Sequence, residues 1–188
     1  MDRAVAGWDT FYVIIGSSAA ALTGLMFVVI TLTAEVRFGV TDRNNGLDAF
    51  ASPTVLHFCL VLLLAAVLTS PLHTATSLGA SLAIVALFGL GYMIPVLLRM
   101  RRVTSYVPVA EDWIWHLVLP FAAYLTIATC SFFVWQGRAN SLYFVAASSL
   151  LLLYIGIHNA WDTVTYITVM RPAGEKAAGP DQAKDAAS

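Results

Sequence analysis

Long apolar runs alternate with short polar segments along this chain. A helix needs about 20 mainly apolar residues to cross the hydrocarbon core of a bilayer. Five runs have roughly this length or more, at residues 8–34, 53–70, 74–98, 113–135 and 141–169. The segments between them are charged or rich in turn-forming residues, as in RMRRVTSYVPVAED and QGRANS. The pattern therefore predicts an all-α, polytopic integral membrane protein with five transmembrane helices.

The composition supports a membrane protein. Hydrophobic residues make up 59% of the chain and charged residues only 11%, whereas soluble domains carry about 25% charged residues. The net charge of −1 provides no broad positive field, so nucleic acid is not an expected partner. The lipid bilayer is the expected partner. The first run is longer than the apolar core of a signal peptide, and we expect it to be retained as a helix.

The last residues, PAGEKAAGPDQAKDAAS, contain too few apolar side chains to bury a core. We therefore expect a five-helix transmembrane domain at residues 1–172 and a disordered cytoplasmic tail at 173–188. The two cysteines, Cys59 and Cys130, fall in different runs and at different expected depths. They are expected to be reduced packing residues and not a disulfide.

The positive charges predict the orientation of the bundle. An odd number of spans places the two ends of the chain on opposite sides of the membrane. The side of the C-terminus carries most of the cations, namely Arg37, Arg43, Arg99, Arg101, Arg102, Arg171, Lys176 and Lys184. The other side has only Arg3 and Arg138. The positive-inside rule then predicts an outside N-terminus and a cytoplasmic C-terminus, in a plasma membrane such as the bacterial inner membrane.

Acidic residues and histidines recur at matching positions of two antiparallel helices. Asp112 and His116 are four residues apart at the inner end of the fourth predicted helix, and His158 and Asp162 are four apart near the inner end of the fifth. Residues at this spacing share one helix face. Because the order of acid and histidine is reversed between the two helices, the two aspartates should be level, and so should the two histidines.

Two further residues extend this layer. Glu35 ends the first run near the expected depth of the aspartates, and His57 lies one turn beyond Pro53, near the depth of the other histidines. Ionisable groups inside a membrane usually mark function, although groups near the boundary can also reach into the headgroups. That ordinary role is equally open for Glu35 and Asp112. The candidate transport or ion-binding residues are Glu35, His57, Asp112, His116, His158 and Asp162.

Two prolines are expected to bend helices close to this layer. Pro120 removes the helical hydrogen bond to the carbonyl of His116, and Pro95 does the same to Gly91. A freed carbonyl at membrane depth must be buried in protein or face water. The two prolines therefore predict a hydrated vestibule on the cytoplasmic side.

The first run carries a stripe of small and hydroxyl-bearing residues at every seventh position. The stripe consists of Thr10, Ser17, Gly24 and Thr31. Small residues also recur every four positions at Gly16, Ala20 and Gly24, a pattern typical of closely packed membrane helices. The favoured interpretation is helix packing within or between subunits. The alternative is a pore stripe that lines a water path toward Glu35.

The sequence favours a transport function over an enzymatic one. Phosphate-binding loops, GxSxG elbows, HExxH motifs and potassium-filter motifs are absent from the sequence, so no catalytic residue is assigned. The first hypothesis is a small channel or transporter for protons or a cation, in which carboxylates attract cations and histidines relay protons or gate. Five helices make a thin bundle, so a homo-oligomer is expected.

Two alternatives remain open at this point. Imidazole and carboxylate groups suit divalent transition metals, and two histidines could ligate a haem iron. The candidate ligands would be His57, His116, His158 and Asp162. In the other alternative the chain is a non-catalytic accessory or scaffold subunit, and the acid–histidine contacts only hold helices together.

Overall fold

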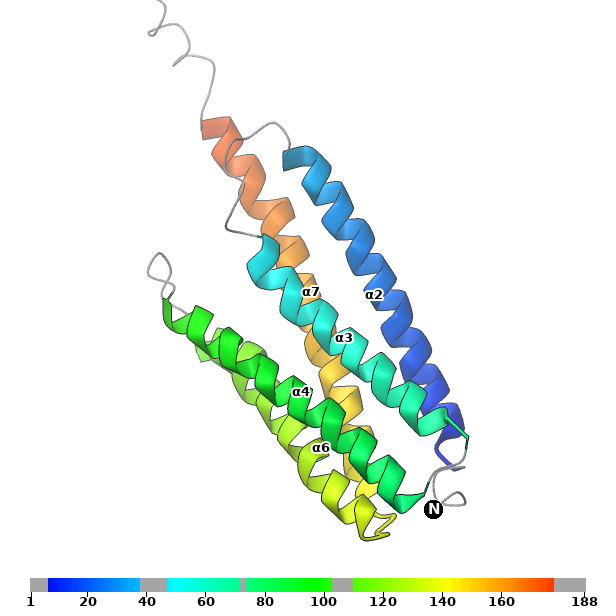
Figure 1. Cartoon of the computed structure of the whole chain (residues 1–188). Coiled ribbons are helices and arrows are strands. Elements are labelled where there is room, and N and C mark those ends of the chain that lie inside the picture. Colours follow the sequence, from blue (N-terminus) through cyan, green and yellow to red (C-terminus); the bar gives the residue numbers. More distant parts are fainter. Residues whose placement is uncertain (1–6, 38–46, 72–73, 103–109, 178–188) are drawn as a thin grey trace, which may run out of the picture.

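The fold is a bundle of long helices (Figure 1). The computed structural model describes residues 7–37, 47–71, 74–102 and 110–177. The long helices are α2 (Asp9–Arg37), α3 (Leu47–Thr69), α4 (Ala75–Arg102), α6 (Leu119–Trp135) and α7 (Ser141–Ala177). A short α5 (Ala110–Trp113) and a π-helical turn, η1 (Ile114–Val118), lead into α6. The predicted all-α class and the five long helices are confirmed.

Four helices are long and apolar enough to cross a membrane. The spans are Asp9–Thr31, Ala75–Leu98, Ile114–Trp135 and Ser141–Asp162. The expected second span corresponds to a shorter apolar section of α3, Pro53–Thr69. The chain is therefore an integral membrane protein with four candidate membrane-crossing helices, and the apolar section of α3 is shorter than each of them.

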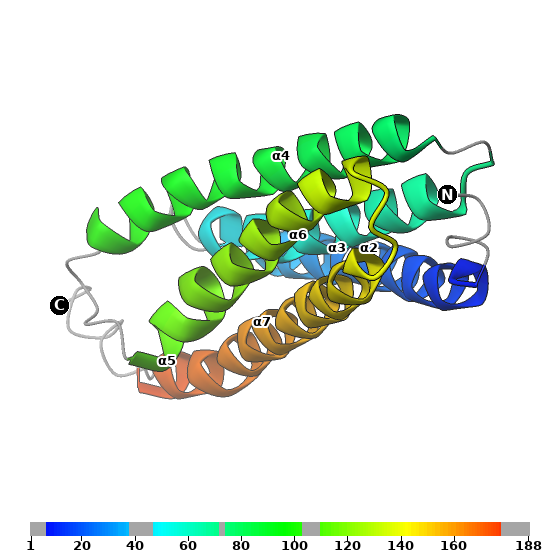
Figure 2. The ribbon, with the colours of Figure 1, turned by 90° about the horizontal axis from the view of Figure 1, so that it is seen from below.

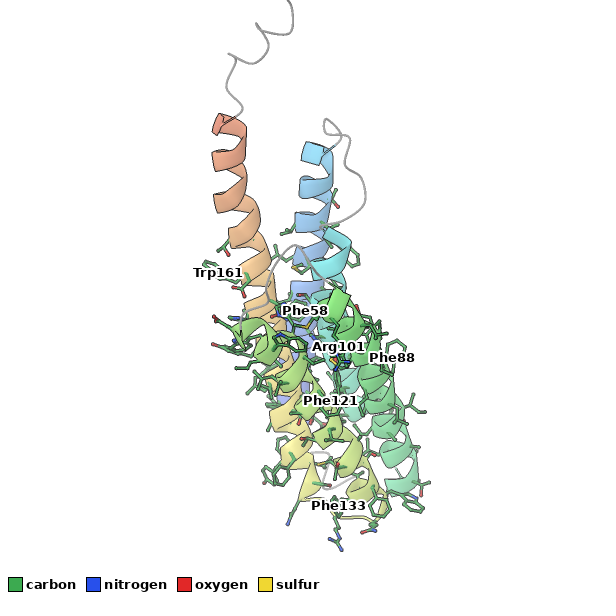
Figure 3. The ribbon with its side chains drawn as sticks, turned by 90° about the vertical axis from the view of Figure 1, so that its left-hand side faces the viewer. Phe58, Phe88, Arg101, Phe121, Phe133 and Trp161 are labelled. Atoms are coloured by element: carbon green, nitrogen blue, oxygen red, sulfur yellow. The ribbon has the colours of Figure 1, made fainter. Side chains whose placement is uncertain are left out.

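The helix with the shorter apolar section, α3, occupies the centre of the bundle. α3 packs against α2, α4 and α7, while α6 packs against α4 and α7. One end of the bundle, here the Trp135 end, contains the turn between α6 and α7. The other, the Ala177 end, contains the last residues of α4 and α7. α4 and α6 lie side by side at the Trp135 end and diverge toward the Ala177 end (Figures 2 and 3).

The core is made of apolar and aromatic side chains from all five long helices. Its largest fully buried apolar members are Tyr12, Phe58, Leu64, Leu68, Leu78, Leu82, Tyr124, Ile127, Leu142, Leu152 and Ile155. Large apolar side chains also cover the outside. Phe88 and Trp161 are 59% and 68% exposed and point away from the bundle, whereas Phe58 lies within it (Figure 3). Helices that are apolar on every side suit a lipid environment.

The region before Pro120 differs from the simple kink that the sequence predicts. The backbone N–H of Leu119 donates to the carbonyl of Ile114, five residues earlier. This π-helical spacing inserts one extra residue into the helix. Because proline has no N–H, the ordinary helical bond to the His116 carbonyl cannot form. The chain accommodates Pro120 by widening the preceding turn, which contains Trp115 and His116.

Two helix ends also differ from the expected boundaries. α3 begins at Leu47 and contains the buried Pro53 within it, instead of starting at residue 53. α7 continues to Ala177, beyond residue 172, where the expected transmembrane domain ends. The rest of that tail, residues 178–188, lies outside the described residues. Both cysteines are free thiols, Cys59 being exposed and Cys130 buried.

Candidate functional site

A buried hydrogen bond joins two helices in the middle of the bundle. Nδ1 of His57, on α3, lies 2.7 Å from the hydroxyl of Tyr124, on α6. Both side chains are fully buried. The other ring nitrogen of His57, Nε2, is also buried and has no hydrogen-bond partner among the described residues. An ionisable ring in the core of a membrane protein therefore has one paired and one unpaired nitrogen.

The Tyr124 ring is positioned by a third helix. It lies so close to Gly89 of α4 that a Cβ atom at that position would be 2.4 Å from the ring. Only a residue without a side chain leaves room for the ring there. The bond between His57 and Tyr124 thus depends on the close approach of α4 and α6.

A second close contact, between α3 and α7, sets the level of two further buried polar groups. The Phe58 ring of α3 lies against Gly156 of α7, where a Cβ atom would be 2.4 Å away. Thr54 and Asn159 are three or four residues from this contact, on the side of the Ala177 end, and both are buried. Since α3 and α7 are antiparallel and a helix rises 1.5 Å per residue, Thr54 and Asn159 are at nearly the same level.

A second histidine lies between an indole and a carboxylate. The ring of His158, on α7, stacks on Trp115 of η1, with ring centroids 3.9 Å apart and an interplanar angle of 24°. Nε2 of His158 is 3.1 Å from Oδ2 of Asp162, one turn further along α7. This distance allows an ion pair, but the two groups are not aligned as a hydrogen bond. The side chains of His158 and Asp162 are 25% and 53% exposed.

These contacts bring the three histidines to similar levels on separate elements. His57 adjoins Phe58, which packs on Gly156, only two residues before His158. His116 adjoins Trp115, which stacks on His158. His116 also lies within electrostatic range of His57. The histidines of α3, η1 and α7 therefore lie within roughly one helical turn of each other along the axis of the bundle.

The predicted stripe of α2 is not part of this interior cluster. Thr10, Ser17, Gly24 and Thr31 are exposed on the outer side of α2, so within one chain the stripe does not face the bundle interior. Gly16 alone of the small residues at four-residue spacing packs tightly, against Ala65 of α3. Glu35 and Asp112 lie in α2 and α5, but their side chains are outside the described part.

The geometry gives no support to a metal centre. The four candidate ligands, His57, His116, His158 and Asp162, are all among the described side chains. Within the described part of the chain, no group of three or more histidine, cysteine, aspartate or glutamate side chains could hold a metal ion. We therefore do not assign these residues as metal ligands.

The sequence interpretation missed several residues of the cluster. Tyr124 and Trp115 read as ordinary aromatic residues of an apolar run, while Thr54 and Asn159 carry no charge that would single them out. One signal was available for Thr54, because it precedes His57 by three residues and so shares its helix face. No comparable pattern marks Tyr124.

Comparison with known proteins does not assign the chain to a family. No protein-family model matches the chain, and neither the curated proteins nor the solved structures gave a match. Any function must therefore be inferred from the site.

Proposed function

We propose that the chain is a small oligomeric membrane channel or transporter that moves protons or a cation through its histidine layer. The bond between His57 and Tyr124 carries this proposal. Ionisable groups are expensive to keep at membrane depth, and where they occur they usually serve function. His57 is fully buried, yet its Nε2 has no partner among the described residues, so packing alone does not account for it.

The neighbouring polar groups support a route toward His57 from the Ala177 end. Asp162 is half-exposed and is paired with the partly buried His158. His158 stacks on Trp115, whose neighbour His116 lies within electrostatic range of His57. A carboxylate at the entrance can concentrate cations, and histidines can accept and release protons near neutral pH. Exposure falls from Asp162 to His158 and then to His57. This order suits the stepwise movement of a proton from the Ala177 end into the core of the bundle.

The Trp135 half of the bundle offers a different environment. Its buried polar side chains include Ser131, Ser141 and Ser149, and each donates to a backbone carbonyl three or four residues earlier in the chain. Around them the core is apolar, with Leu64, Leu68 and Ile127 fully buried. The proposal therefore places the rest of the route between subunits of a homo-oligomer.

The proposal includes an orientation. The Ala177 end faces the cytoplasm of a bacterial-type plasma membrane, and the N-terminus faces outside, because most of the cations lie at or beyond the Ala177 end. The acid–histidine cluster then lies on the cytoplasmic side.

A scaffold role is the second candidate. It is favoured by the pairing of polar groups across helices, since His57 joins α3 to α6 and His158 joins α7 to η1. Buried polar contacts of this kind can fix helices in one register. In that case the pairs would matter for stability and not for flux.

Proton flux into proteoliposomes distinguishes the two candidates. The purified chain is reconstituted with an internal pH-sensitive dye, and flux is driven by an imposed membrane potential. We expect His57→Gln and Asp162→Asn each to lower proton flux by about tenfold or more, which corresponds to ~1.4 kcal/mol in the barrier. The matched controls are His73→Gln, outside the described residues, and Glu111→Gln, on the exposed side of α5.

The controls should keep the flux of the unmodified chain, and all variants should elute from size exclusion as it does. Unchanged flux in both site variants would contradict the transport proposal. If the unmodified chain moves neither protons nor alkali cations and both site variants lose thermal stability, the scaffold role is the better account.

A further inference from the structure

The stacked contact between His158 and Trp115 connects a partly exposed, titratable side chain to the π-helical turn η1. Trp115 belongs to η1, the π-helical turn that precedes Pro120. π-helical turns hold one extra residue and are frequent at functional sites. His158 belongs to the regular helix α7, and its side chain is 25% exposed although Nε2 itself is buried, so water reaches another part of the ring. The contact therefore joins the regular α-helix α7 to a π-helical turn.

Protonation would strengthen this contact on both sides of the imidazole ring. A cation placed over the face of tryptophan is attracted by the ring, and tryptophan is the strongest partner for this interaction. The centroid distance of 3.9 Å and the angle of 24° place the rings face to face. On the other side, Asp162 lies 3.1 Å from His158 Nε2 and becomes an ion-pair partner when His158 is charged.

Besides those of α7 itself, the titratable groups near His158 come from three of the elements that pack on α7. Those elements are α2, α3, α6 and η1. Among the described side chains of α7 and of these four elements, the titratable groups on this side of the bundle are Tyr154 and Asp162 of α7, His116 of η1, Tyr124 of α6 and His57 of α3. α2 contributes none there among its described side chains. Asp162 is the only carboxylate in this set, and it pairs with His158.

We propose that His158, Trp115 and Asp162 form a proton-sensitive latch that fastens the π-helical turn η1 to α7. Acidification charges His158 and tightens its contacts with the indole and the carboxylate. At higher pH the neutral ring retains only the stacking contact, and η1 is freer to rearrange. The latch does not require transport, because it would act in the same way in a scaffold protein.

Tryptophan fluorescence tests the latch directly. A charged imidazole in contact with an indole quenches its emission. The emission of the full chain in lipid nanodiscs is followed from pH 8 to pH 5. We expect the unmodified chain to lose emission on acidification, and Trp115→Phe and His158→Gln each to remove most of that change. Trp135→Phe, at the opposite end of the bundle, is the matched control and should keep the change.

A second variant and a second measurement protect the test against misfolding. His158→Phe keeps an aromatic ring on the indole but cannot take a proton, and it should also lack the pH response. Hydrogen exchange of residues 114–119, corrected for the intrinsic pH dependence, should be slower at low pH in the unmodified chain only. The latch is refuted if emission does not respond to pH, if His158→Phe responds normally, or if exchange is the same at both pH values. Since neither readout involves flux, failure of the latch and failure of the transport proposal can be told apart.

Discussion

A single imidazole, that of His57, combines full burial with an incomplete set of hydrogen bonds. The hydroxyl of Tyr124 can donate to Nδ1 or accept from it, so the pair is compatible with either neutral tautomer of His57. In both cases Nε2 has no partner among the described residues. A buried polar atom without a partner costs about 1–3 kcal/mol. Because this arrangement costs stability, we infer that His57 has a functional role beyond packing.

Removing the Tyr124 hydroxyl tests the contribution of this pair to stability. Tyr124→Phe keeps the ring against Gly89 but leaves Nδ1 of His57 buried without its partner. We expect the free energy of unfolding in detergent to fall by about 1–3 kcal/mol, measured by chemical denaturation followed by circular dichroism. Tyr143→Phe, at a tyrosine that is 66% exposed, should change stability little. Equal stability of the two variants would show that the buried bond contributes nothing measurable.

At the scale of helices, close approach at glycine positions determines which side chains meet. Gly89 admits the Tyr124 ring between α4 and α6, and Gly156 admits the Phe58 ring between α3 and α7. Both contacts lie within a few residues of a histidine of the cluster or its partner. The glycines that allow close helix packing therefore help to determine where the polar side chains lie.

One added methyl group should separate α4 from the Tyr124 ring. In Gly89→Ala the new Cβ atom would be 2.4 Å from a ring carbon, so the ring or the helix must move. Overpacking of this kind typically costs about 1–3 kcal/mol, and the displaced hydroxyl would lose its alignment with His57. Gly91→Ala, in the same helix but with open space around it, is the control. Thermal unfolding in detergent should show a lower midpoint for Gly89→Ala alone, and similar midpoints would contradict the packing described.

The positions of the helices could be predicted from the sequence, but their rotations could not. Apolar run length locates the long helices because a bilayer imposes it. These helices are apolar on every side, however, so no polar face indicates which residues turn inward. The sequence pattern therefore predicts a packing or pore stripe from Thr10 to Thr31, which is exposed, and it does not indicate the buried Tyr124. The π-helical turn at Trp115 and His116 also has no sequence signal beyond Pro120.

At the scale of the whole molecule, the bundle has an apolar exterior and a cation-rich end. Exposed apolar residues occur on all five long helices, including Val13, Leu63, Phe88, Phe132 and Leu150. Arg101 is exposed at the end of α4, beside the segment that continues into residues 103–109. The charge asymmetry predicts which end faces the cytoplasm.

Labelling of single cysteines tests that orientation. Both native cysteines are replaced by alanine, and a cysteine is introduced at Arg138, in the turn between α6 and α7, or at Ser188. A membrane-impermeant maleimide applied to intact cells should label Arg138→Cys and leave Ser188→Cys unlabelled until the membrane is permeabilised. The reverse pattern would place the acid–histidine cluster on the outside and would contradict the proposed entry of protons from the cytoplasm.

The length of α7 determines how far its last turns extend beyond the membrane. Its 37 residues extend about 55 Å, whereas the hydrocarbon core is only about 30 Å thick. Even with Ser141 placed at one boundary of the hydrocarbon, an upright α7 would carry its last turns roughly 25 Å beyond the opposite one. A macromolecule that recognises this terminus would thus dock clear of the lipid headgroups and need not touch the membrane surface.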